Sequence, residues 1–493
     1  MGAGAIRAGV TASNKRQRSL TIRTNIPQRL DRLPWSRFHL LLVVALGVTW
    51  ILDGLEVTIV GAIGPVLQSP DALHLSSEQI GAAASFYLVG AVVGALLSGW
   101  ITDRYGRRLV FYVTLCTYLA GVLLSSLSWS FLSFACFRAL TGLGIGGEYA
   151  AVNSAIDELI PAKYRGRIDL IVNGSFWLGA AAGSGASLWM LQPGLLPVNV
   201  GWRLGFAVGG ILGLCVLFLR RWVPESPRWL VTHCREQEAE RTTSDIEARV
   251  VATGVGQLPP VQGSLEVHPR KVFGLGMIFN SMLKENRARS LLALSLMVAQ
   301  AFLFNAVFFT YGLVLSQFYH VDQTRVGLYL LPLTLGNFAG PLLLGPLFDT
   351  IGRKKMIAST FLLSALLLLA TAAAFGAGML SAFTQTAAWI CIFFFASAAA
   401  SSAYLTASEI FPLETRALAI ACFYALGTAI GGTFAPVLFA WLIQSGSHWR
   451  LAGGYILAAV LLALAAVMEW LFGVAAEGKS LESIAAPLSS RGG

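Results

Sequence analysis

The chain has 493 residues, of which 56% are hydrophobic and only 12% are charged, and its formal net charge is +10. Soluble globular proteins carry roughly 25% charged residues, so this composition excludes an ordinary soluble enzyme. A basic chain can indicate a nucleic-acid-binding protein, but here the charge is confined to loops and termini, and we expect no nucleic-acid partner. The six cysteines lack metal-ligand or disulfide-framework spacing. We interpret them as small buried side chains and expect no metal ion and no cofactor.

Apolar segments of near-spanning length recur along the chain. A helix needs roughly 20 apolar residues to cross a bilayer. The first six segments are 39–62, 79–101, 108–127, 130–152, 169–190 and 203–222. The second six are 290–314, 326–348, 355–375, 388–408, 417–441 and 452–472. The sequence therefore predicts an all-α membrane protein with twelve transmembrane helices in two six-helix bundles.

The polar segments divide the chain into five parts. These are an N-terminal arm (1–38), a first bundle (39–222), a linker (223–289), a second bundle (290–473) and a tail (474–493). We expect short amphipathic helices in the linker and disorder at the end of the tail. If both termini lie on the same side of the membrane, most lysines and arginines fall in the arm, loops, linker and tail on that side. Basic loops are retained in the cytoplasm, so we expect both termini in the cytoplasm. We also expect a protein of the bacterial plasma membrane without a cleaved signal peptide.

The two halves repeat the same loop motifs at a nearly constant offset. Gly99-x-x-x-Asp103-Arg104-x-Gly106-Arg107-Arg108 recurs as Gly345-x-x-x-Asp349-x-x-Gly352-Arg353-Lys354. Glu158-x-x-Pro161-x-x-x-Arg165 recurs as Glu409-x-x-Pro412-x-x-x-Arg416. Motif pairs in equivalent loops indicate a parallel duplication of a six-helix unit. Glycines in these loops permit close helix contact and tight turns.

These motifs, together with Pro224-Glu225-Ser226-Pro227-Arg228-Trp229 and the tail element Glu477-Gly478-Lys479-Ser480-Leu481-Glu482, resemble the major facilitator superfamily. The resemblance is to its sugar-porter-like branch of metabolite–proton symporters. It implies two bundles that rock about a central site and are locked on the cytoplasmic side by the loop motifs. The residues that we assign to this cytoplasmic gate are Asp103, Arg107, Glu158, Arg165, Glu225, Asp349, Arg353, Glu409 and Arg416.

Three ionisable residues are predicted at membrane depth, where an unpaired charge is costly. Asp53 and Glu56 are three residues apart and share one side of the first helix. Arg138 lies in the fourth span, and the resemblance implies that it pairs with the acid at position 56. We expect these residues to couple transport to protons, with Glu56 as the first candidate for the proton site and Asp53 as the second.

Six residues are predicted to bind the substrate. The resemblance places Gln300, Asn305 and Phe309 of the seventh span, Asn173 of the fifth and Tyr404 of the tenth in the central site, and we add Trp177. Asn173 stands where sugar porters keep a glutamine, and Tyr404 stands where they keep a tryptophan. Each departure removes a hydroxyl-binding or ring-stacking feature, so the site is expected to be more aromatic than a sugar site.

The sequence predicts a monomeric transporter and not an enzyme. The favoured function is proton-coupled uptake of a small organic metabolite by alternating access. The alternative is a carrier of organic anions such as aromatic or pyridine carboxylates. A drug-efflux antiporter is a third reading, against which the Pro224–Trp229 element and the tail motif argue.

Overall fold

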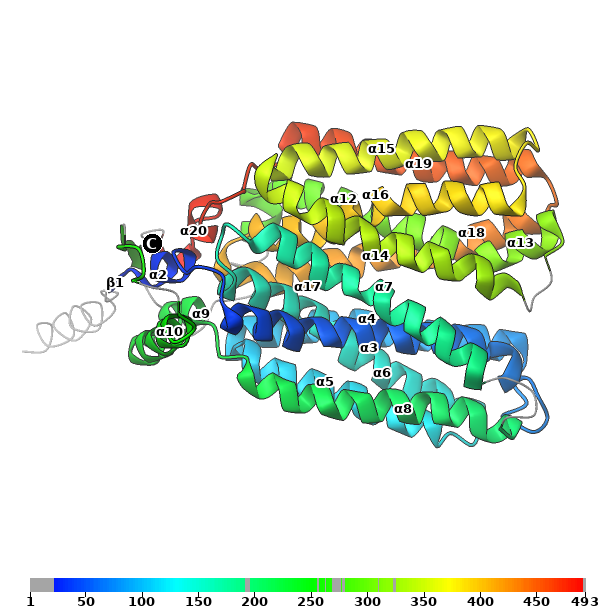
Figure 1. Cartoon of the computed structure of the whole chain (residues 1–493), viewed down its shortest axis with the longest axis horizontal. Coiled ribbons are helices and arrows are strands. Elements are labelled where there is room, and N and C mark those ends of the chain that lie inside the picture. Colours follow the sequence, from blue (N-terminus) through cyan, green and yellow to red (C-terminus); the bar gives the residue numbers. More distant parts are fainter. Residues whose placement is uncertain are drawn as a thin grey trace, which may run out of the picture.

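A computed structural model describes residues 22–490, apart from 191–195, 255–256, 262, 268–275, 277–279, 309 and 322–324. The described chain is almost entirely helical, with two bundles of long helices side by side (Figure 1). The first bundle contains α3 (Arg37–Leu67), α4 (Ser77–Tyr105), α5 (Arg107–Ser126), α6 (Phe131–Leu159), α7 (Arg165–Met190) and α8 (Val198–Leu219). The second contains α12 (Arg287–Phe308), α13 (Tyr311–Tyr319), α14 (Val326–Thr350), α15 (Arg353–Gly376), α16 (Ala382–Glu409), α17 (Arg416–Gly427), α18 (Thr433–Gln444) and α19 (His448–Phe472). The expected all-helical architecture is confirmed.

Two predicted spans are interrupted. The expected segment 290–314 is α12 followed by the separate helix α13, which begins at Tyr311. The expected segment 417–441 is α17 and α18, joined by a π-helical turn, η5 (Thr428–Gly432). At Gly431 a Cβ would lie only 2.7 Å from the carbonyl oxygen of Val298 in α12. The glycine therefore allows the irregular turn to press against α12, where the two helices border the space between the bundles.

Ten helical segments in the described chain are long and apolar enough to cross a membrane. Two of the predicted spans, 130–152 and 169–190, are not among them. Their helices, α6 and α7, are long enough, at 29 and 26 residues. They are more polar because they carry buried groups such as Arg138, Glu148 and Asp169. Interior helices of a transporter are shielded from lipid by the others, so they tolerate polar side chains that lipid-facing helices exclude.

The halves meet mainly along two helix pairs. Helix α4 packs against α17, and α7 packs against α14. A Cβ at Gly99 would come within 2.6 Å of the Cβ of Ala421 on the opposite half, so this glycine is required for the close approach.

The outward surface is apolar. Five cysteines, Cys116, Cys136, Cys215, Cys234 and Cys391, are exposed. The expectation that the cysteines are buried was wrong, because the long helices turn apolar side chains outward as well as inward and Cys234 lies in the exposed turn after the short helix α9 (Pro227–Thr232).

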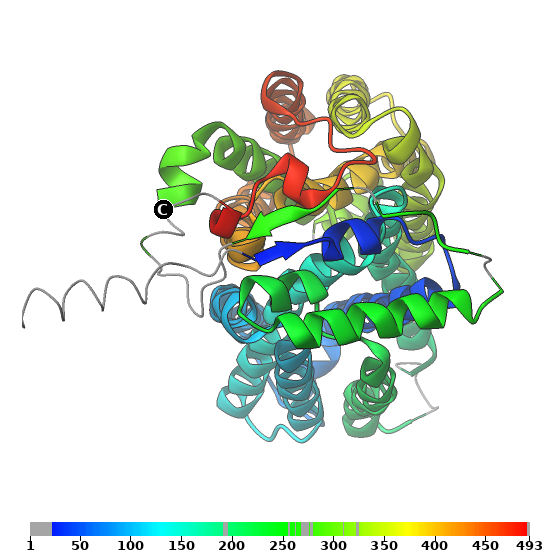
Figure 2. The ribbon, with the colours of Figure 1, turned by 90° about the vertical axis from the view of Figure 1, so that its left-hand side faces the viewer.

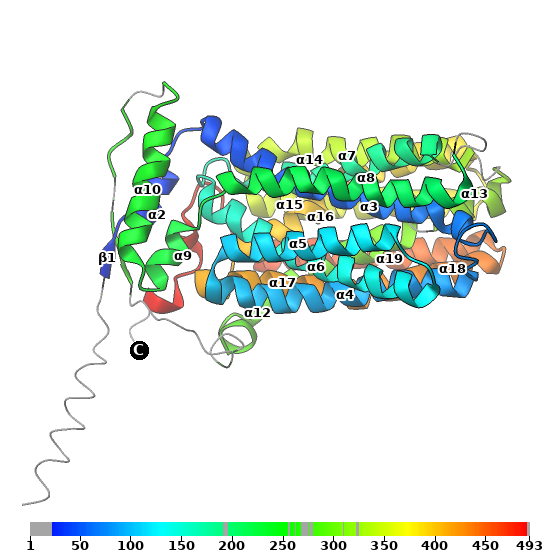
Figure 3. The same ribbon diagram turned by 90° about the horizontal axis from the view of Figure 1, so that it is seen from below.

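A collar of short elements covers one end of the bundles (Figures 1 and 2). It comprises β1 (Ile22–Thr24), α2 (Ile26–Asp31), η1 (Arg220–Trp222), α9 (Pro227–Thr232), α10 (Glu236–Val251), β2 (Leu265–Val267), η2 (Ser281–Glu285), η4 (Leu413–Thr415), α20 (Leu481–Ile484) and η6 (Leu488–Ser490). Strands β1 and β2 pair antiparallel, with Ile22 opposite Val267. In Figure 3, α10 runs across the ends of the long helices. The linker thus contains the short helices that the sequence predicts.

The tail is folded onto the collar. The Glu414 carboxylate accepts hydrogen bonds from the backbone N–H groups of Leu488 and Ser489, at 2.9 and 3.0 Å. The Arg228 guanidinium lies 2.5 Å from Glu482 and 2.9 Å from Asp31. The expectation of disorder at the end of the tail was wrong as far as Ser490, because buried charge pairs fix it, and residues 491–493 lie outside the described chain. Burial would raise the pKa of Glu482, but the charge and hydrogen bonds of Arg228 outweigh it and hold this pKa below its usual value.

Candidate transport site and gate

A cavity of about 210 Å³ lies between the two bundles. Both halves contribute to its wall, which is what a site that is served by rocking bundles requires. Five of the six predicted substrate residues line it: Asn173, Trp177, Gln300, Asn305 and Tyr404. The sixth, Phe309, lies outside the described residues. The other lining residues are Trp50, Asp53, Val57, Tyr87, Leu88, Tyr149, Phe176, Ala301, Phe304, Phe308, Ser397, Ala400, Ser401, Tyr424 and Thr428.

Aromatic rings dominate two sides of this cavity. On one side Trp177 of α7 stacks on Phe304 of α12, with ring centroids 5.2 Å apart, and meets Phe308 edge-on at 5.1 Å. On the other side Tyr149 of α6 stacks on Tyr424 of α17 at 4.6 Å. Each stack joins a helix of the first half to a helix of the second. The aromatic rings therefore both shape the cavity and hold the bundles together around it.

Amide side chains supply polar contacts to the cavity. Asn305 donates to the carbonyl of Ala301, at 2.7 Å. Asn173 uses its Nδ2 group twice, toward the Asn153 Oδ1 atom and the Asp169 carbonyl oxygen, both at 2.9 Å. Its own Oδ1 atom has no hydrogen-bond partner among the described residues. A buried amide acceptor of this kind is costly unless a ligand or water satisfies it.

Asp53 is the one acidic or basic side chain among the described residues of the cavity wall. It is 1% exposed, and its two carboxylate oxygens accept from the hydroxyl groups of Tyr87 and Tyr149, at 3.2 and 2.8 Å. No arginine or lysine lies within ion-pair distance of it in the described chain. Because an unpaired buried carboxylate is costly when it is ionised, this geometry favours the protonated form of Asp53 in the closed cavity.

Glu56 lies behind Asp53 and pairs with Arg138. The Arg138 guanidinium also lies 4.5 Å from the ring centroid of Tyr87, one of the two tyrosines that hold Asp53. The predicted trio is therefore brought together, but its members differ in position. Asp53 borders the cavity, whereas neither Glu56 nor Arg138 is among the residues that line it.

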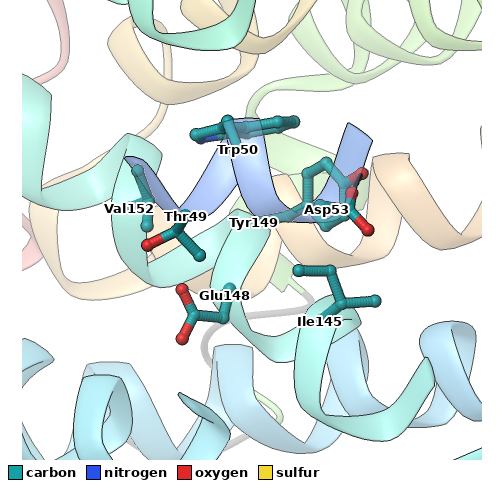
Figure 4. Close-up of a pocket in the computed structure, with 7 residues that line it drawn as sticks. All are labelled: Thr49, Trp50, Asp53, Ile145, Glu148, Tyr149 and Val152. Carbon is teal, nitrogen blue, oxygen red and sulfur yellow. Dashed lines mark hydrogen bonds between the residues drawn. The ribbon is translucent and has the colours of Figure 1, made fainter. Parts of the chain in front are cut away.

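A small void adjoins Asp53 on the other side (Figure 4). Its volume is about 10 Å³, room for roughly one water molecule, and it is lined by Thr49, Trp50, Asp53, Ile145, Glu148, Tyr149 and Val152. Glu148 pairs with Arg220, and the Arg220 guanidinium donates to Thr49 at 2.7 Å. This second buried ion pair was not predicted from the sequence, although Glu148 lies within a predicted span, 130–152.

The gate residues gather at the collar end of the bundles and are almost fully buried. In the first half Arg107 lies 2.6 Å from Glu158 and 3.6 Å from Asp103. In the second half Arg353 lies 2.7 Å from Asp349 and 3.1 Å from Glu409. Two bridges cross between the halves: Arg416 to Glu158 at 3.5 Å, and Arg165 to Glu409 at 3.6 Å. The duplicated motifs therefore form a duplicated charge network that joins the two halves.

The two motif aspartates act on the opposite half. Asp103 accepts from the backbone N–H groups of Ala417 and Leu418, the first turn of α17, at 3.2 and 2.9 Å. Asp349 accepts from Gly166 and Arg167, the first turn of α7, at 3.1 and 3.0 Å. Free N–H groups and the helix dipole make a helix N-terminus attractive to a carboxylate. Each aspartate thus caps the N-terminus of a helix in the opposite half.

Glu225 and Glu477 hold the turns beside these aspartates. Glu225 accepts from the N–H groups of Arg107 and Arg108, at 2.9 and 3.2 Å, and Glu477 accepts from that of Arg353 at 3.2 Å. Gly106 and Gly352, with φ of 98° and 117°, make the turns possible. Burial raises the pKa of Glu225 above its usual value, although these N–H groups oppose the shift. Glu477 belongs to the tail motif but was not predicted to be a gate residue.

Comparisons with known proteins agree with this architecture. The model of the family described as "Sugar (and other) transporter" matches residues 35–487. The chain belongs to this family. The niacin transporter NiaP of Acinetobacter baylyi is 28% identical over 471 residues, which cover 93% of this chain and 99% of that protein. The 4-hydroxybenzoate transporter PcaK of the same organism is 28% identical over 50% of this chain and 52% of that protein. The structure of the proton:xylose symporter XylE bound to 6-bromo-6-deoxy-D-glucose has a TM-score of 0.74 and 20% identity, with 91% and 98% of the two chains covered.

Membership of this family makes the chain a multi-pass membrane transporter and not an enzyme. It also confirms the expected major facilitator fold with twelve helices, in which α6 and α7 are the two interior members that fall short of spanning hydropathy. The cavity of this chain is aromatic, with the rings of Trp177, Phe304 and Tyr149 in its wall. The family's broad description leaves the transported compound open.

Proposed function

We propose that this transporter takes up a small aromatic carboxylate together with a proton, by alternating access between the two bundles. The observation that carries the proposal is the pairing of an aromatic cavity with the single carboxylate of Asp53 in its described wall. Flat rings such as Trp177 and Phe304 offer stacking surfaces for an aromatic substrate. The names of two relatives, a niacin transporter and a 4-hydroxybenzoate transporter, support the same class of compound.

Charge explains why a proton would be required. An ionised Asp53 would repel a substrate carboxylate in a cavity whose described wall has no basic side chain. Protonation of Asp53 removes that repulsion and frees its tyrosine partners, Tyr87 and Tyr149, to donate elsewhere. Substrate and proton would then bind together, and because the charges of the anion and the proton cancel, the pair would add no net charge to the closed cavity. This role for Asp53 revises the order of candidates suggested by sequence position, which put Glu56 first.

An organic cation is the second candidate, because an aromatic cavity with one carboxylate is also suited to a cation. Three ligands that share one ring but differ in charge distinguish the two candidate functions. They are pyridine-3-carboxylate, its neutral amide, and the N-methylated amide cation. We expect the carboxylate to raise the melting temperature of the purified protein, and more strongly at acid than at neutral pH. Stabilisation by the cation alone, which strengthens as pH rises, would overturn the proposal in favour of the cation. Arabinose tests whether a sugar is accepted.

We also propose that the protein is a monomer in the bacterial plasma membrane with its gate, collar and both termini in the cytoplasm. The basic residues of the arm, linker and gate loops support this orientation. In a chain freed of native cysteines, we expect Asp71→Cys and Ala377→Cys, in loops at the end opposite the gate, to react with an impermeant maleimide in intact cells. We expect Ala252→Cys, beside α10, to react only after the membrane is opened. Labelling of Ala252→Cys in intact cells would reverse the topology.

A further inference from the structure

Two buried aspartates lie between the cavity and the gate and belong to neither. Helices α6 and α7 run antiparallel and are joined by the hydrogen bond between Asn153 and Asn173, at 2.9 Å. Asp157 follows Asn153 by one helical turn, and Asp169 precedes Asn173 by one turn. Both carboxylates therefore lie on the gate side of the amide pair. Asp157 is also the strongest electrostatic neighbour of Asp169 among charged groups in the described chain.

These carboxylates are fully buried, and no hydrogen bond of good geometry reaches them in the described part of the chain. Asp157 and Asp169 are both 0% exposed, and none of their four carboxylate oxygens has a hydrogen-bond partner in the described chain. The nearby donors are engaged elsewhere. The Ser408 hydroxyl, a neighbour of Asp157, donates to the Leu405 carbonyl at 2.8 Å, and the Asn173 amide donates to Asn153 and to the Asp169 backbone. The unpartnered Asn173 Oδ1 atom adds one more acceptor to this cluster.

The arginines around the pair are already matched by other acids. The charged groups that face Asp157 are Glu409 of α16, Arg165 of α7 and Arg416 of α17, and those that face Asp169 are Asp157, Glu409 and Arg353 of α15. Each of these arginines already has an ion pair. Arg165 pairs with Glu409, and Arg416 pairs with Glu158. Arg353 pairs with both Asp349 and Glu409. The ion pairs of the described residues leave Asp157 and Asp169 out. Two ionised carboxylates in such a place would cost several kcal/mol, because burial and mutual repulsion both oppose the charge.

We propose that Asp157 and Asp169 form a proton-binding site that is separate from Asp53 and that keeps at least one proton while the gate is closed. A proton on either carboxylate removes the like-charge repulsion and supplies the donor that this cluster of acceptors lacks. When the bundles part at the gate, water reaches the pair and the proton is released to the gate side, which the proposed topology places in the cytoplasm. The site takes up a proton again as the gate closes.

The consequence is a gate whose closure depends on pH on its own side. Acid favours the closed gate, because the closed form binds one proton more than the open form. Alkaline pH favours opening. Because this proton enters and leaves on the same side, it does not change the number of protons carried with each substrate. The site therefore regulates transport. Its role does not depend on whether Asp53 is the coupling residue.

The test measures gate opening directly. Spin labels at Tyr105 and Ile351, both 50% exposed at the gate ends of α4 and α14, report the distance between the halves in nanodiscs. All variants carry Asp53→Asn, so that coupling at Asp53, or its failure, cannot affect the result, and sodium-free buffer is used. In this background we expect the closed distance to dominate at acid pH and the open-to-closed ratio to rise by up to about tenfold per pH unit. Adding Asp157→Asn/Asp169→Asn, which mimics the protonated pair, should keep the gate closed at alkaline pH.

The sign of the response separates this proposal from a structural role. If the aspartates were ionised and helped to hold the gate through the arginines, the double asparagine variant would open the gate at every pH, and the proposal would be wrong. A background without pH-dependent opening would also overturn it, even if the double variant did not fold. Equal melting temperatures of the two proteins confirm that folding is intact. A response to sodium at fixed pH in the background would identify a metal-cation site instead and reject the proton site.

Discussion

Asp53→Asn is expected to abolish accumulation of substrate against its gradient while leaving exchange of substrate across the membrane intact. Asparagine mimics a permanently protonated aspartate, so the cavity still accepts the substrate and the bundles still rock, but no proton is released. A gradient of one pH unit is worth about 1.4 kcal/mol, or about tenfold accumulation for one proton per substrate. In proteoliposomes with such a gradient, we expect this ratio in the wild type and equal concentrations on both sides in the variant. Counterflow without a gradient measures the exchange.

Glu56→Gln is the comparison that separates coupling from stability. It leaves the Arg138 guanidinium buried without its partner, and breaking a buried pair costs roughly 3–5 kcal/mol. We therefore expect this variant to lose thermal stability, and the double variant Glu56→Gln/Arg138→Gln to regain it. If the double variant still accumulates substrate, Glu56 is a structural residue. Uphill transport by Asp53→Asn, with loss of coupling in the double variant, would instead return the proton site to Glu56.

The sequence predicted the helical architecture and the gathering of the motif charges at one end of the bundles, because both depend on local signals. Apolar length identifies membrane helices, and the recurrence of a motif around Asp103 and Asp349 reveals the duplication without any knowledge of contacts. Three expectations that depend on three-dimensional neighbours failed. The interruption near Thr428, the outward-facing cysteines and the ordered tail are all decided by packing between segments that lie far apart in the chain.

Only some residues of the candidate site were predicted, because the roles of the others depend on contacts between segments that lie far apart in the chain. The family resemblance placed Asn173, Gln300 and Asn305 in the site, and the need of buried amides for hydrogen-bond partners supported that placement. Tyr149 was overlooked, because its role depends on a stack with Tyr424 on the other half and on its hydroxyl reaching Asp53. Sequence spacing alone also could not rank Asp53 against Glu56, which are only three residues apart. The ranking proposed here comes from which of the two borders the cavity.

Asp103→Asn and Asp349→Asn are expected to weaken the closed gate equally and to slow transport while leaving substrate affinity nearly unchanged. Each carboxylate accepts two backbone N–H bonds from the first turn of a helix in the other half. Asparagine keeps one acceptor oxygen but loses the charge that favours the helix N-terminus. Hydrogen bonds to charged groups contribute about 1.5–3 kcal/mol. The ratio of closed to open gate should therefore fall by about 10- to 100-fold.

The same spin-label pair at Tyr105 and Ile351 measures this shift, and counterflow and ligand-induced melting measure rate and affinity. Arg104→Gln is the matched control. Arg104 is exposed, follows Asp103 in the last turn of α4, and contacts the rings of Trp100 and Tyr105 on the same helix. It therefore carries a charge of the same motif but caps no helix of the other half in the described chain. The gating role requires that Asp103→Asn opens the gate and that Arg104→Gln does not. Wild-type transport in both aspartate variants would mean that the duplicated motif only orients the protein in the membrane. An equal effect of the two aspartates, by contrast, is what a gate built from two copies of one cap demands, because each half closes on the other through the same geometry.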